Sequence, residues 1–400
     1  MKPMNGCALF GAYRALSGVR DAVVVQHSVV GCNWGTLAMA QSRLYDIRQA
    51  STVIYEDDVI YGGSGLVTRA LREIDALYSD CSTAFVISGC VPNMIGDDVQ
   101  AAVAEYTGTK QIICVSAPGY AGSESKGMER ALLQLASLCR SCGRTAAPSI
   151  NILGVTAADP YALNDLDILR GLLASKIKIN CAVHNCCAAE LAHLPAAHLN
   201  IVFGSGVQLA QKLQQDYGIP YVKLAYPYGV QGMLDFLQIL EQELTVDLAA
   251  VRANIIEESK TLVRKAAALL PALYGLPAAL TGSGAQLEGM RRFVQRELGM
   301  EPVICVDADR EEQNALAHRL ADSDAVLLLG SSLEKALAEK YQLPLVRYAY
   351  PVFDEYILGR QGLLGVQGTA LLLEKIINGA LQQNYKSEGL FSGLRRELER

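Results

Sequence analysis

Three cysteines in the first quarter of the chain are the residues best suited to chemistry. Cys7 lies near the start, and Cys32 and Cys90 each follow an apolar segment and a glycine, in "AVVVQHSVVGC" and "TAFVISGC". Thiolates are the usual ligands of iron–sulfur clusters. One interpretation is that Cys7, Cys32 and Cys90 bind one such cluster. The alternative is that they are small apolar core residues, a common role for buried cysteine.

The apolar segments before Cys32 and Cys90 must position these thiols. If both segments are strands of one parallel sheet, their carboxyl ends lie at the same edge and the two thiols can converge there. Gly31 and Gly89 let the backbone approach closely. Turns at strand ends also offer free N–H groups, which stabilise the negative charge of a cluster. Three thiolates would leave a fourth position for another ligand or another chain.

Short apolar runs rich in valine and isoleucine alternate along the chain with segments of helical periodicity. Continuous apolar strands between helices are typical of parallel sheets covered on both faces. We predict an α/β fold with three doubly wound, Rossmann-like parallel-sheet units in a row. The predicted strands are "AVVVQH", "TAFVISG", "QIICVSA", "INILGVT", "IKINCAV", "LNIVFG", "AALTGSG", "VICVDA" and "AVLLLGS".

An internal repeat links two later parts of the chain. Segments that begin at Gly204 and Gly330 both open with Gly-Ser, continue through Tyr-x-x-Pro and Ala-Tyr-Pro, and end in Gly-Val-Gln-Gly. The second copy contains an insertion, "FDEYILGRQGLL", which we expect to form a loop at the carboxyl end of a strand, where ligands bind in open α/β sheets. One long helix is predicted from residue 245 to Gly275. The predicted domains are 1–147, 148–245 and 246–400.

Composition excludes several classes of protein. The 400 residues carry a formal net charge of −6 and no long basic run, which argues against binding to nucleic acid. No apolar stretch is long enough to span a bilayer, and the start does not read as a signal peptide. We therefore expect a cytoplasmic protein. Its 11 cysteines are odd in number and widely spread, so reduced thiols are expected rather than a disulfide framework.

Two further groups of cysteines are candidate metal ligands. His184, Cys186 and Cys187 follow a predicted strand, and soft sulfur and nitrogen ligands suit iron, zinc or nickel. A helix N-terminus with partly buried thiols is the preferred interpretation, because adjacent residues of a helix point about 100° apart. Cys139 and Cys142 form a C-x-x-C pair, which we interpret as the end of a helix.

Other polar residues are candidates for a pocket. His27 ends a predicted strand near Cys32, where a hydrogen bond to a cluster or substrate and a purely structural role are equally open. In the insertion, Asp354, Glu355, Tyr356 and Arg360 offer proton donors and an anion clamp. The segments "GSGVQ" and "GSGAQLEG" open predicted helices and could bind anions at the helix N-termini.

The ordered combination of these motifs resembles the family of nitrogenase catalytic components and their relatives. Relatives usually read His-Gly-Pro-x-Gly-Cys where this chain has His27-Ser-Val-Val-Gly-Cys32. The matching segments are Cys7 with "GAYRALSGV" behind it, "VVQHSVVGC", "EDDVIYGGSGL", "SGCVPNMIGDDV", "APGYAG", "LAQKLQQDYGIPYV" and "GSSLEKALAEKYQLPLV".

The resemblance implies a nitrogenase catalytic-subunit-like fold and a redox function. It implies that two homologous chains, or two copies of this one, each contribute cysteines to an iron–sulfur cluster at their interface. That cluster would be a 4Fe–4S cluster or a larger, P-cluster-like one. It also implies electron supply by a separate ATP-dependent iron–sulfur reductase protein. The chain has no G-x-x-x-x-G-K-[ST] motif, so ATP hydrolysis is expected in that partner.

The chain also departs from nitrogenase. The family's metallocluster cysteine is missing at Phe203-Gly204-Ser205, and "YPVFDEYILGRQGLLG" has no histidine. We therefore expect no nitrogenase-type Mo–Fe cofactor and no dinitrogen reduction. The first expected function is a subunit of a nitrogenase-like two-component reductase for a small-molecule or tetrapyrrole-type substrate. The alternatives are a scaffold for metallocofactor assembly and an α/β binding protein that has lost its cluster.

Overall fold

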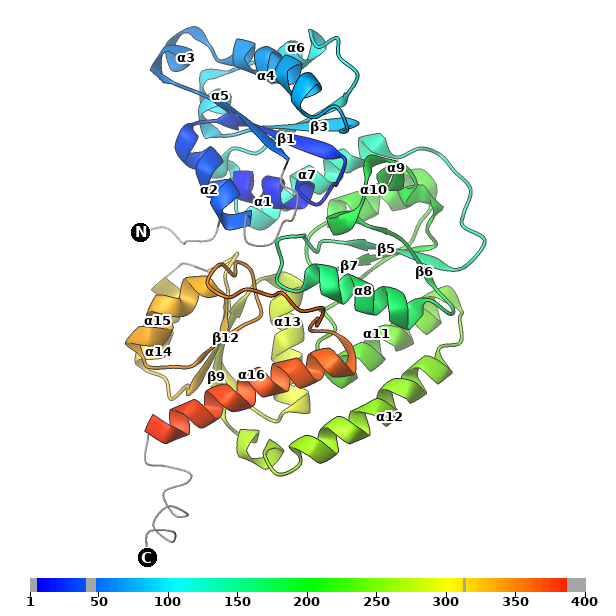
Figure 1. The fold of residues 1–400 in the computed structure, drawn as a ribbon, viewed down its shortest axis with the longest axis vertical. Coiled ribbons are helices and arrows are strands. Elements are labelled where there is room, and N and C mark those ends of the chain that lie inside the picture. The colour runs from blue at the N-terminus through cyan, green and yellow to red at the C-terminus, as the bar shows by residue number, and fades with distance from the viewer. Residues whose placement is uncertain (1–5, 41–47, 312–313, 387–400) are drawn as a thin grey trace, which may run out of the picture. The chain divides into compact units, whose positions relative to one another are not determined.

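Three parallel sheets organise the chain in the computed structural model, which describes residues 6–40, 48–311 and 314–386 (Figure 1). Within those residues each sheet has four strands, in the order second, first, third, fourth along the chain. Crossovers on both sides of the first strand are typical of doubly wound α/β folds. The predicted fold class is confirmed.

The first sheet carries two of the three cysteines at its edge. Its strands are β1 (Ala22–Ser28), β2 (Gln49–Val53), β3 (Thr83–Ser88) and β4 (Gln111–Ser116). Val24 packs in the core with α1 and α7, whereas Val23 and Val25 pack with α4 on the opposite face. Both faces of β1 are therefore covered, which explains its unbroken apolar run. The flanking helices are α1 (Ala8–Leu16), α2 (Val30–Ala40), α3 (Glu56–Tyr61), α4 (Ser64–Leu77), α5 (Cys90–Ile95), α6 (Val99–Ala104) and α7 (Glu124–Gln134), with the 3₁₀ helices η1 (Gly119–Ala121) and η2 (Leu135–Leu138).

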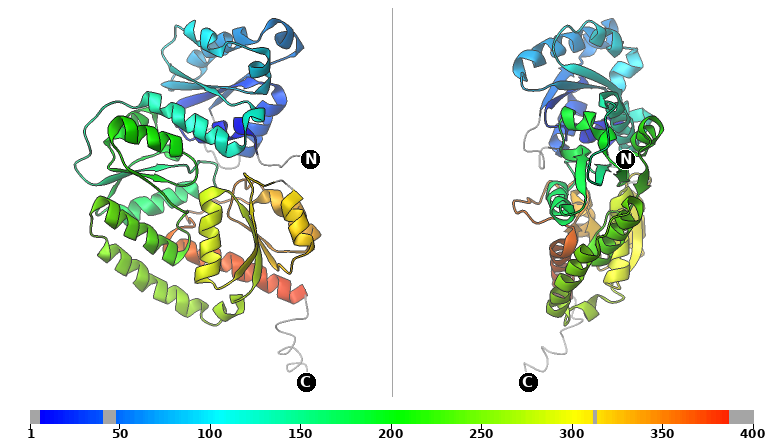
Figure 2. Two further views of the ribbon diagram at one scale, coloured as in Figure 1. Left: turned by 180° about the vertical axis from the view of Figure 1, so that it is seen from behind. Right: turned by 90° about the vertical axis from the view of Figure 1, so that its right-hand side faces the viewer.

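The second sheet has the order β6-β5-β7-β8. Helix α7 contacts both α1, beside the first sheet, and α10, beside the second (Figure 2). The buried apolar side chains of these helices belong to one core. The strands are β5 (Ser149–Leu153), β6 (Lys178–Ala182), β7 (Leu199–Val202) and β8 (Tyr221–Lys223). The helices are α8 (Ala162–Leu173), η3 (Val183–Asn185), α9 (Ala188–Ala192), η4 (Leu194–Ala196) and α10 (Val207–Tyr217).

The third sheet has the order β10-β9-β11-β12. Its strands are β9 (Pro277–Gly282), β10 (Glu301–Asp307), β11 (Leu327–Gly330) and β12 (Leu345–Arg347). The helices of this part are α11 (Gly229–Leu244), α12 (Ala249–Ala266), η5 (Leu270–Leu273), α13 (Gly284–Arg292), the π-helix η6 (Phe293–Glu297), α14 (Asn314–Ala321), η7 (Ser332–Glu334), α15 (Lys335–Lys340) and α16 (Gly365–Lys386).

The chain divides into two compact units. The described residues of Asn5–Leu166 and Leu173–Leu224 form one unit, and those of Asp167–Leu172 and Ala225–Arg400 form the other. The first unit thus contains two sheets and the second contains one. The three-domain division with boundaries near residues 147 and 245 stays a prediction. None of the helices in the described parts of the chain has the length and apolar character needed to cross a membrane.

Two helix predictions are wrong at their ends. The helix expected to run from residue 245 to Gly275 ends at Ala266, and a short 3₁₀ turn containing Pro271 follows. Proline cannot continue a helix, because it has no N–H to donate and its ring clashes with the preceding turn. The helix expected to include Cys139 and Cys142 ends at Leu138, and Cys139 is extended.

Candidate metal centre

Cys32 and Cys90 lie at the ends of neighbouring strands, as predicted. Strands β1 and β3 pair in parallel at the centre of the first sheet. Cys32 lies in the first turn of α2, which follows β1, and Cys90 is the first residue of α5, which follows β3. This is the point where the strand order reverses, and ligands of doubly wound sheets bind at that point.

Cys7 reaches the same point from another direction. It is the N-cap residue of α1, and its backbone bridges to Ser123 just before α7. A side chain built on Gly119 would place its Cβ 2.9 Å from the Cys7 sulfur and 3.2 Å from the Cys90 sulfur. Burial raises the pKa of the Cys32 thiol, and the nearby Cys7 and Cys90 sulfurs raise it further. The structure therefore brings the three thiols together.

The surroundings of these thiols suit negatively charged sulfur. Each cysteine lies at the start of a helix, where the helix dipole favours negative charge. The backbone N–H of Gly119 donates a hydrogen bond to the Cys90 sulfur at 3.0 Å. All three cysteines are free thiols. The donor set and the side-chain-free space at Gly119 fit an iron–sulfur cluster.

A single metal ion is a different case. Within the described residues, no group of three or more His, Cys, Asp or Glu side chains is arranged to hold one ion. Thiolates on one zinc ion lie about 4 Å from one another, since each Zn–S bond is about 2.3 Å. A cluster of several irons accepts ligands that are more widely spaced. The three thiols are therefore compatible with a cluster of several irons.

His27 is tied into the protein rather than exposed to a cavity. Its side chain is fully buried and hydrogen-bonds Thr52 of β2 through Nδ1 and Asp97 through Nε2. Asp97 in turn accepts a hydrogen bond from the N–H of Gly63 at 2.8 Å. Burial lowers the pKa of His27, and the Asp97 carboxylate opposes that shift. The histidine thus cross-links the end of β1 to the segments around Gly63 and Asp97. Of the two roles that the sequence left open for His27, these contacts favour the structural one.

The later cysteine groups do not form a comparable centre. His184 is buried in η3, Cys186 is buried beside it, and Cys187 is the N-cap residue of α9. Contact with Cys181 and burial raise the pKa of Cys186 well above its usual value. Burial likewise raises the pKa of Cys139 to about 12. Both thiols pack in or against the apolar core, where cysteine acts as a small apolar residue.

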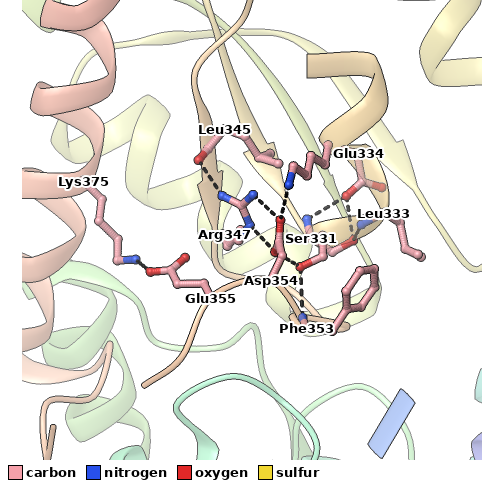
Figure 3. A network of polar contacts seen from close by, with 11 residues as sticks. Ser331, Leu333, Glu334, Leu345, Arg347, Phe353, Asp354, Glu355 and Lys375 are labelled. Atoms are coloured by element: carbon pink, nitrogen blue, oxygen red, sulfur yellow. Dashed lines mark hydrogen bonds and ion pairs between the residues drawn. The ribbon is translucent and has the colours of Figure 1, made fainter. Parts of the chain in front are cut away.

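Two of the predicted pocket residues of the insertion, Asp354 and Glu355, are held in ion pairs (Figure 3). Arg347 donates two hydrogen bonds to Asp354, at 2.7 and 2.6 Å, and lowers its pKa to about 2. Glu355 pairs with Lys375 of α16. An ionised carboxylate is not a proton donor near neutral pH, so Asp354 anchors the loop. Arg360 is exposed in the same loop.

An internal carboxylate occupies the helix N-terminus of "GSGVQ". Glu129 of α7 accepts hydrogen bonds from the N–H groups of Gly206, Val207 and Gln208, at 2.7, 3.1 and 3.1 Å. The helix therefore binds an anion, as its position allows, but the anion is a side chain of the same unit. No external ligand is needed to explain this glycine-rich turn.

Two residues of the centre were not predicted from the sequence. Gly119 contacts two of the three thiols, and Glu124 accepts a hydrogen bond from the N–H of Gly6, next to Cys7. Gly119 belongs to "APGYAG", one of the segments that carried the family resemblance, so a signal for it was present. Glu124 lay in no such motif.

The comparisons with known proteins bear on the whole chain. The family described as "Nitrogenase component 1 type Oxidoreductase" matches residues 7–381. The chain belongs to this family. Its fold agrees with a solved structure titled "Nitrogenase Cp1 at pH 6.5", with a TM-score of 0.83 and 19% identity over 97% of this chain and 94% of that one.

Differently named members of the family are similar to this chain. It is 30% identical to the nitrogenase iron-molybdenum cofactor biosynthesis protein NifE of Nostoc sp., over 81% of this chain and 69% of that protein. It is 26% identical to the nitrogenase molybdenum-iron protein alpha chain of Methanothermobacter marburgensis, over 84% and 77%. It is 22% identical to a subunit of the light-independent protochlorophyllide reductase of Synechococcus sp., over 93% and 82%.

Proposed function

We propose that this chain is one subunit of a nitrogenase-like two-component reductase, in which Cys7, Cys32 and Cys90 hold an iron–sulfur cluster. The observation that supports the proposal is the convergence of these thiols, each at a helix start, with Cys7 and Cys90 beside Gly119 and Cys32 near both sulfurs. When bound, such a cluster accepts and passes on single electrons at low potential. A 4Fe–4S cluster and a larger, P-cluster-like one both fit three thiolates and a contribution from another chain.

The residues around the thiols have their own tasks in this function. The helix starts and the Gly119 N–H lower the cost of placing negative charge at the site. The His27–Asp97 contact holds the end of β1 against the turn that follows α5, and so fixes the two strand-end cysteines relative to each other. A rigid site limits the rearrangement needed when the charge changes.

A partner chain is part of the proposal, because apolar side chains are exposed around the thiols. We call these side chains the thiol-side patch. They lie on α2, on α5, on η1 and on α3, which contacts α5. Exposed apolar groups of this kind mark interaction surfaces. The patch consists of Val30, Trp34, Tyr55, Val59, Ile60, Tyr61, Met94 and Tyr120.

The proposed occupant of the patch is a homologous chain or a second copy of this one, which would add the remaining cluster ligands. Electrons would come from an ATP-dependent iron–sulfur protein in the cytoplasm. We propose a small-molecule or tetrapyrrole-type substrate, which agrees with the name of one relative, a protochlorophyllide reductase subunit. We do not propose dinitrogen as the substrate, because the family's metallocluster cysteine and histidine are both missing.

A second candidate function is a scaffold for metallocofactor assembly. Relatives that are 30% identical to this chain are named cofactor biosynthesis proteins, which favours this alternative. Turnover separates the two functions. A reductase must consume substrate when an ATP-driven iron–sulfur partner supplies electrons, whereas a scaffold must release a metallocluster to an acceptor protein without such turnover.

The cluster itself is tested by anaerobic purification followed by iron and sulfide analysis and electron paramagnetic resonance. Wild-type protein is expected to be brown and to contain iron and sulfide in stoichiometric amounts. Cys90→Ala is expected to lose most of its iron. Cys142→Ala is the matched control, because Cys142 is also a partly exposed thiol but lies in the segment after η2. Unchanged iron in Cys90→Ala would disprove the proposed ligand.

A further inference from the structure

The side chain of Glu124, the first residue of α7, is engaged at both oxygens. Oε2 accepts a hydrogen bond at 3.0 Å from the N–H of Gly6, the residue directly before Cys7. Oε1 accepts a hydrogen bond from the guanidinium of Arg14, in the last turn of α1. Both side chains are buried. One carboxylate thus holds the backbone at one end of α1 and the side chain at the other.

Arg14 extends this contact to a second loop. Its Nη2 donates to Asp159 at 2.8 Å and to the hydroxyl of Thr156 at 3.3 Å. Asp159 also accepts hydrogen bonds from the N–H and the hydroxyl of Thr156, at 2.6 and 2.9 Å. The guanidinium is therefore fixed between two buried carboxylates. Arginine suits such a site because its planar group donates in several fixed directions.

Helix α1 has little freedom to move against α7. A Cβ on Gly11 would lie 1.8 Å from the Glu124 carbonyl oxygen, and one on Gly127 would lie 1.9 Å from the Ala8 carbonyl oxygen. The two backbones are therefore in direct contact at both glycines. Beside Cys7, a Cβ on Gly6 would lie 2.8 Å from Glu124 Oε2. The turn that carries Cys7 is thus fitted to the Glu124 side chain.

We propose that Glu124 is a positioning residue for the Cys7 thiol, and that Arg14 holds Glu124 in place. This inference rests on the proposed function, because it assigns Glu124 to the same cluster site. Without the carboxylate, the Gly6 N–H loses its acceptor and Arg14 loses one of its two buried carboxylate partners. The first turn of α1 is then free to shift, and the Cys7 sulfur moves away from the position shared with Cys90.

The test compares Glu124→Ala and Glu124→Gln with Glu129→Ala in the full-length protein, purified without oxygen. Glu129 is the matched control, because it lies on the same helix and also accepts backbone N–H groups, but at α10. The measurements are iron per chain, the rate of iron loss to a chelator, the electron paramagnetic resonance spectrum and the thermal midpoint.

Glu124→Ala is expected to lose iron to the chelator about 10-fold faster than wild type and to show a shifted resonance spectrum, the usual scale for loss of a residue that orients a ligand. Glu124→Gln keeps an oxygen acceptor for Gly6 but turns an NH2 donor toward Arg14, so its iron loss is expected to lie between those of wild type and Glu124→Ala. Glu129→Ala is expected to lower the thermal midpoint and to leave iron and spectrum unchanged.

Two results would overturn the inference alone while the wild type still holds its cluster. One is wild-type iron retention and spectrum in Glu124→Ala, and the other is an equal loss in Glu129→Ala. A wild-type protein without iron and sulfide would overturn the proposed function, and the inference with it. The iron content of the wild type therefore distinguishes a failure of the inference from a failure of the proposed function.

Discussion

At the scale of single residues, Gly119 determines how closely two of the thiols approach each other. Any side chain at this position would meet the Cys7 sulfur at 2.9 Å and the Cys90 sulfur at 3.2 Å. The sulfurs can make room only by rotating about their Cα–Cβ bonds, which takes them away from the position that they share. Gly119→Ala is therefore expected to separate the thiols and to speed iron loss about 10-fold. Iron release to a chelator measures this effect.

Gly143→Ala is the control for that substitution, because an added Cβ there meets no atom within 4 Å. Its iron content is expected to equal that of the wild type. Full iron retention in Gly119→Ala would show that the space at Gly119 has no part in binding a cluster.

Asp354 leads to a prediction about acid stability. Its pKa is about 2 in the folded protein and about 3.9 in an unfolded chain, so folding favours the ionised form. The stabilisation from Arg347 is therefore fully present above about pH 4 and is lost as the pH falls towards 2. Asp354→Asn, which resembles the protonated form, is expected to lower the free energy of unfolding by about 2 kcal/mol at pH 7.

Urea denaturation at pH 7 and at pH 3.5 tests this dependence. The difference between Asp354→Asn and wild type must shrink at the lower pH. Asp167→Asn is the control, since Asp167 forms only an exposed pair with Arg170. Its effect is expected to stay within about 0.5 kcal/mol. A constant difference for Asp354→Asn at both pH values would contradict the assigned cause.

At the scale of elements, the contact between α1 and α7 is the tightest feature near the candidate centre. An added methyl group at Gly127 would lie 1.9 Å from a backbone oxygen of Ala8, so the helices must separate. Gly127→Ala is expected to lower the free energy of unfolding by about 3 kcal/mol. Gly171→Ala, in α8, meets no atom within 4 Å and is expected to raise it by about 0.5–1 kcal/mol.

Denaturation of both variants shows whether the loss of stability in Gly127→Ala comes from the α1–α7 contact or from replacing glycine by alanine in a helix. Effects of opposite sign support a steric origin in the α1–α7 contact. If both variants lose stability, the loss in Gly127→Ala cannot be assigned to close packing alone.

The strands were predictable from sequence where they are buried on both faces. The runs around β1, β3 and β7 are continuous and apolar, and each forms a strand at nearly the predicted bounds. Strand β2, "QASTV", was missed because it is a short edge strand with polar residues and no apolar run. The end of α12 was misplaced because helical periodicity continues past the point where Pro271 stops the helix.

The candidate centre was predictable in its cysteines but not in its supporting residues. Cys32 and Cys90 follow strands, and strand pairing alone places them at one edge. Gly119 lies in a segment that carried the family resemblance, but Glu124 acts through contacts with residues far away in the chain, which no local pattern encodes. Likewise, the acids of the insertion looked free in sequence, whereas Arg347 and Lys375 pair with them in the structure.

At the scale of the whole molecule, the sheets share one strand order, but different groups lie at the point where that order reverses. In each sheet the order reverses between its first and third strands in the chain, where open α/β sheets bind ligands. In the first sheet that position holds the thiols. In the second, the Glu129 carboxylate occupies the helix N-terminus after β7. Among the described residues of the first compact unit, only the thiol edge combines a donor set with exposed apolar surroundings.

The thiol-side patch gives the last prediction, which concerns assembly. Trp34 is 71% exposed in the helix that carries Cys32, and Tyr61 is 84% exposed on α3. Large aromatic side chains at the centre of an interface carry much of its binding energy, and a buried unpaired charge there is strongly unfavourable. We expect the wild-type protein to form at least a dimer, and Trp34→Glu to reduce its mass to that of one chain. Tyr274→Glu is the matched control, because Tyr274 is 82% exposed but lies outside the patch.

Sedimentation velocity under anaerobic conditions measures both variants beside the wild type. Loss of the dimer in Trp34→Glu but not in Tyr274→Glu would locate the interface beside Cys32. The Trp34→Glu substitution should also lower iron per chain, because a cluster held by three thiolates needs its remaining ligands from the second chain. A dimer that survives Trp34→Glu would place the contact elsewhere. A wild-type protein with the mass of one chain would exclude a second copy as the occupant, and would require a different homologous chain to complete the site.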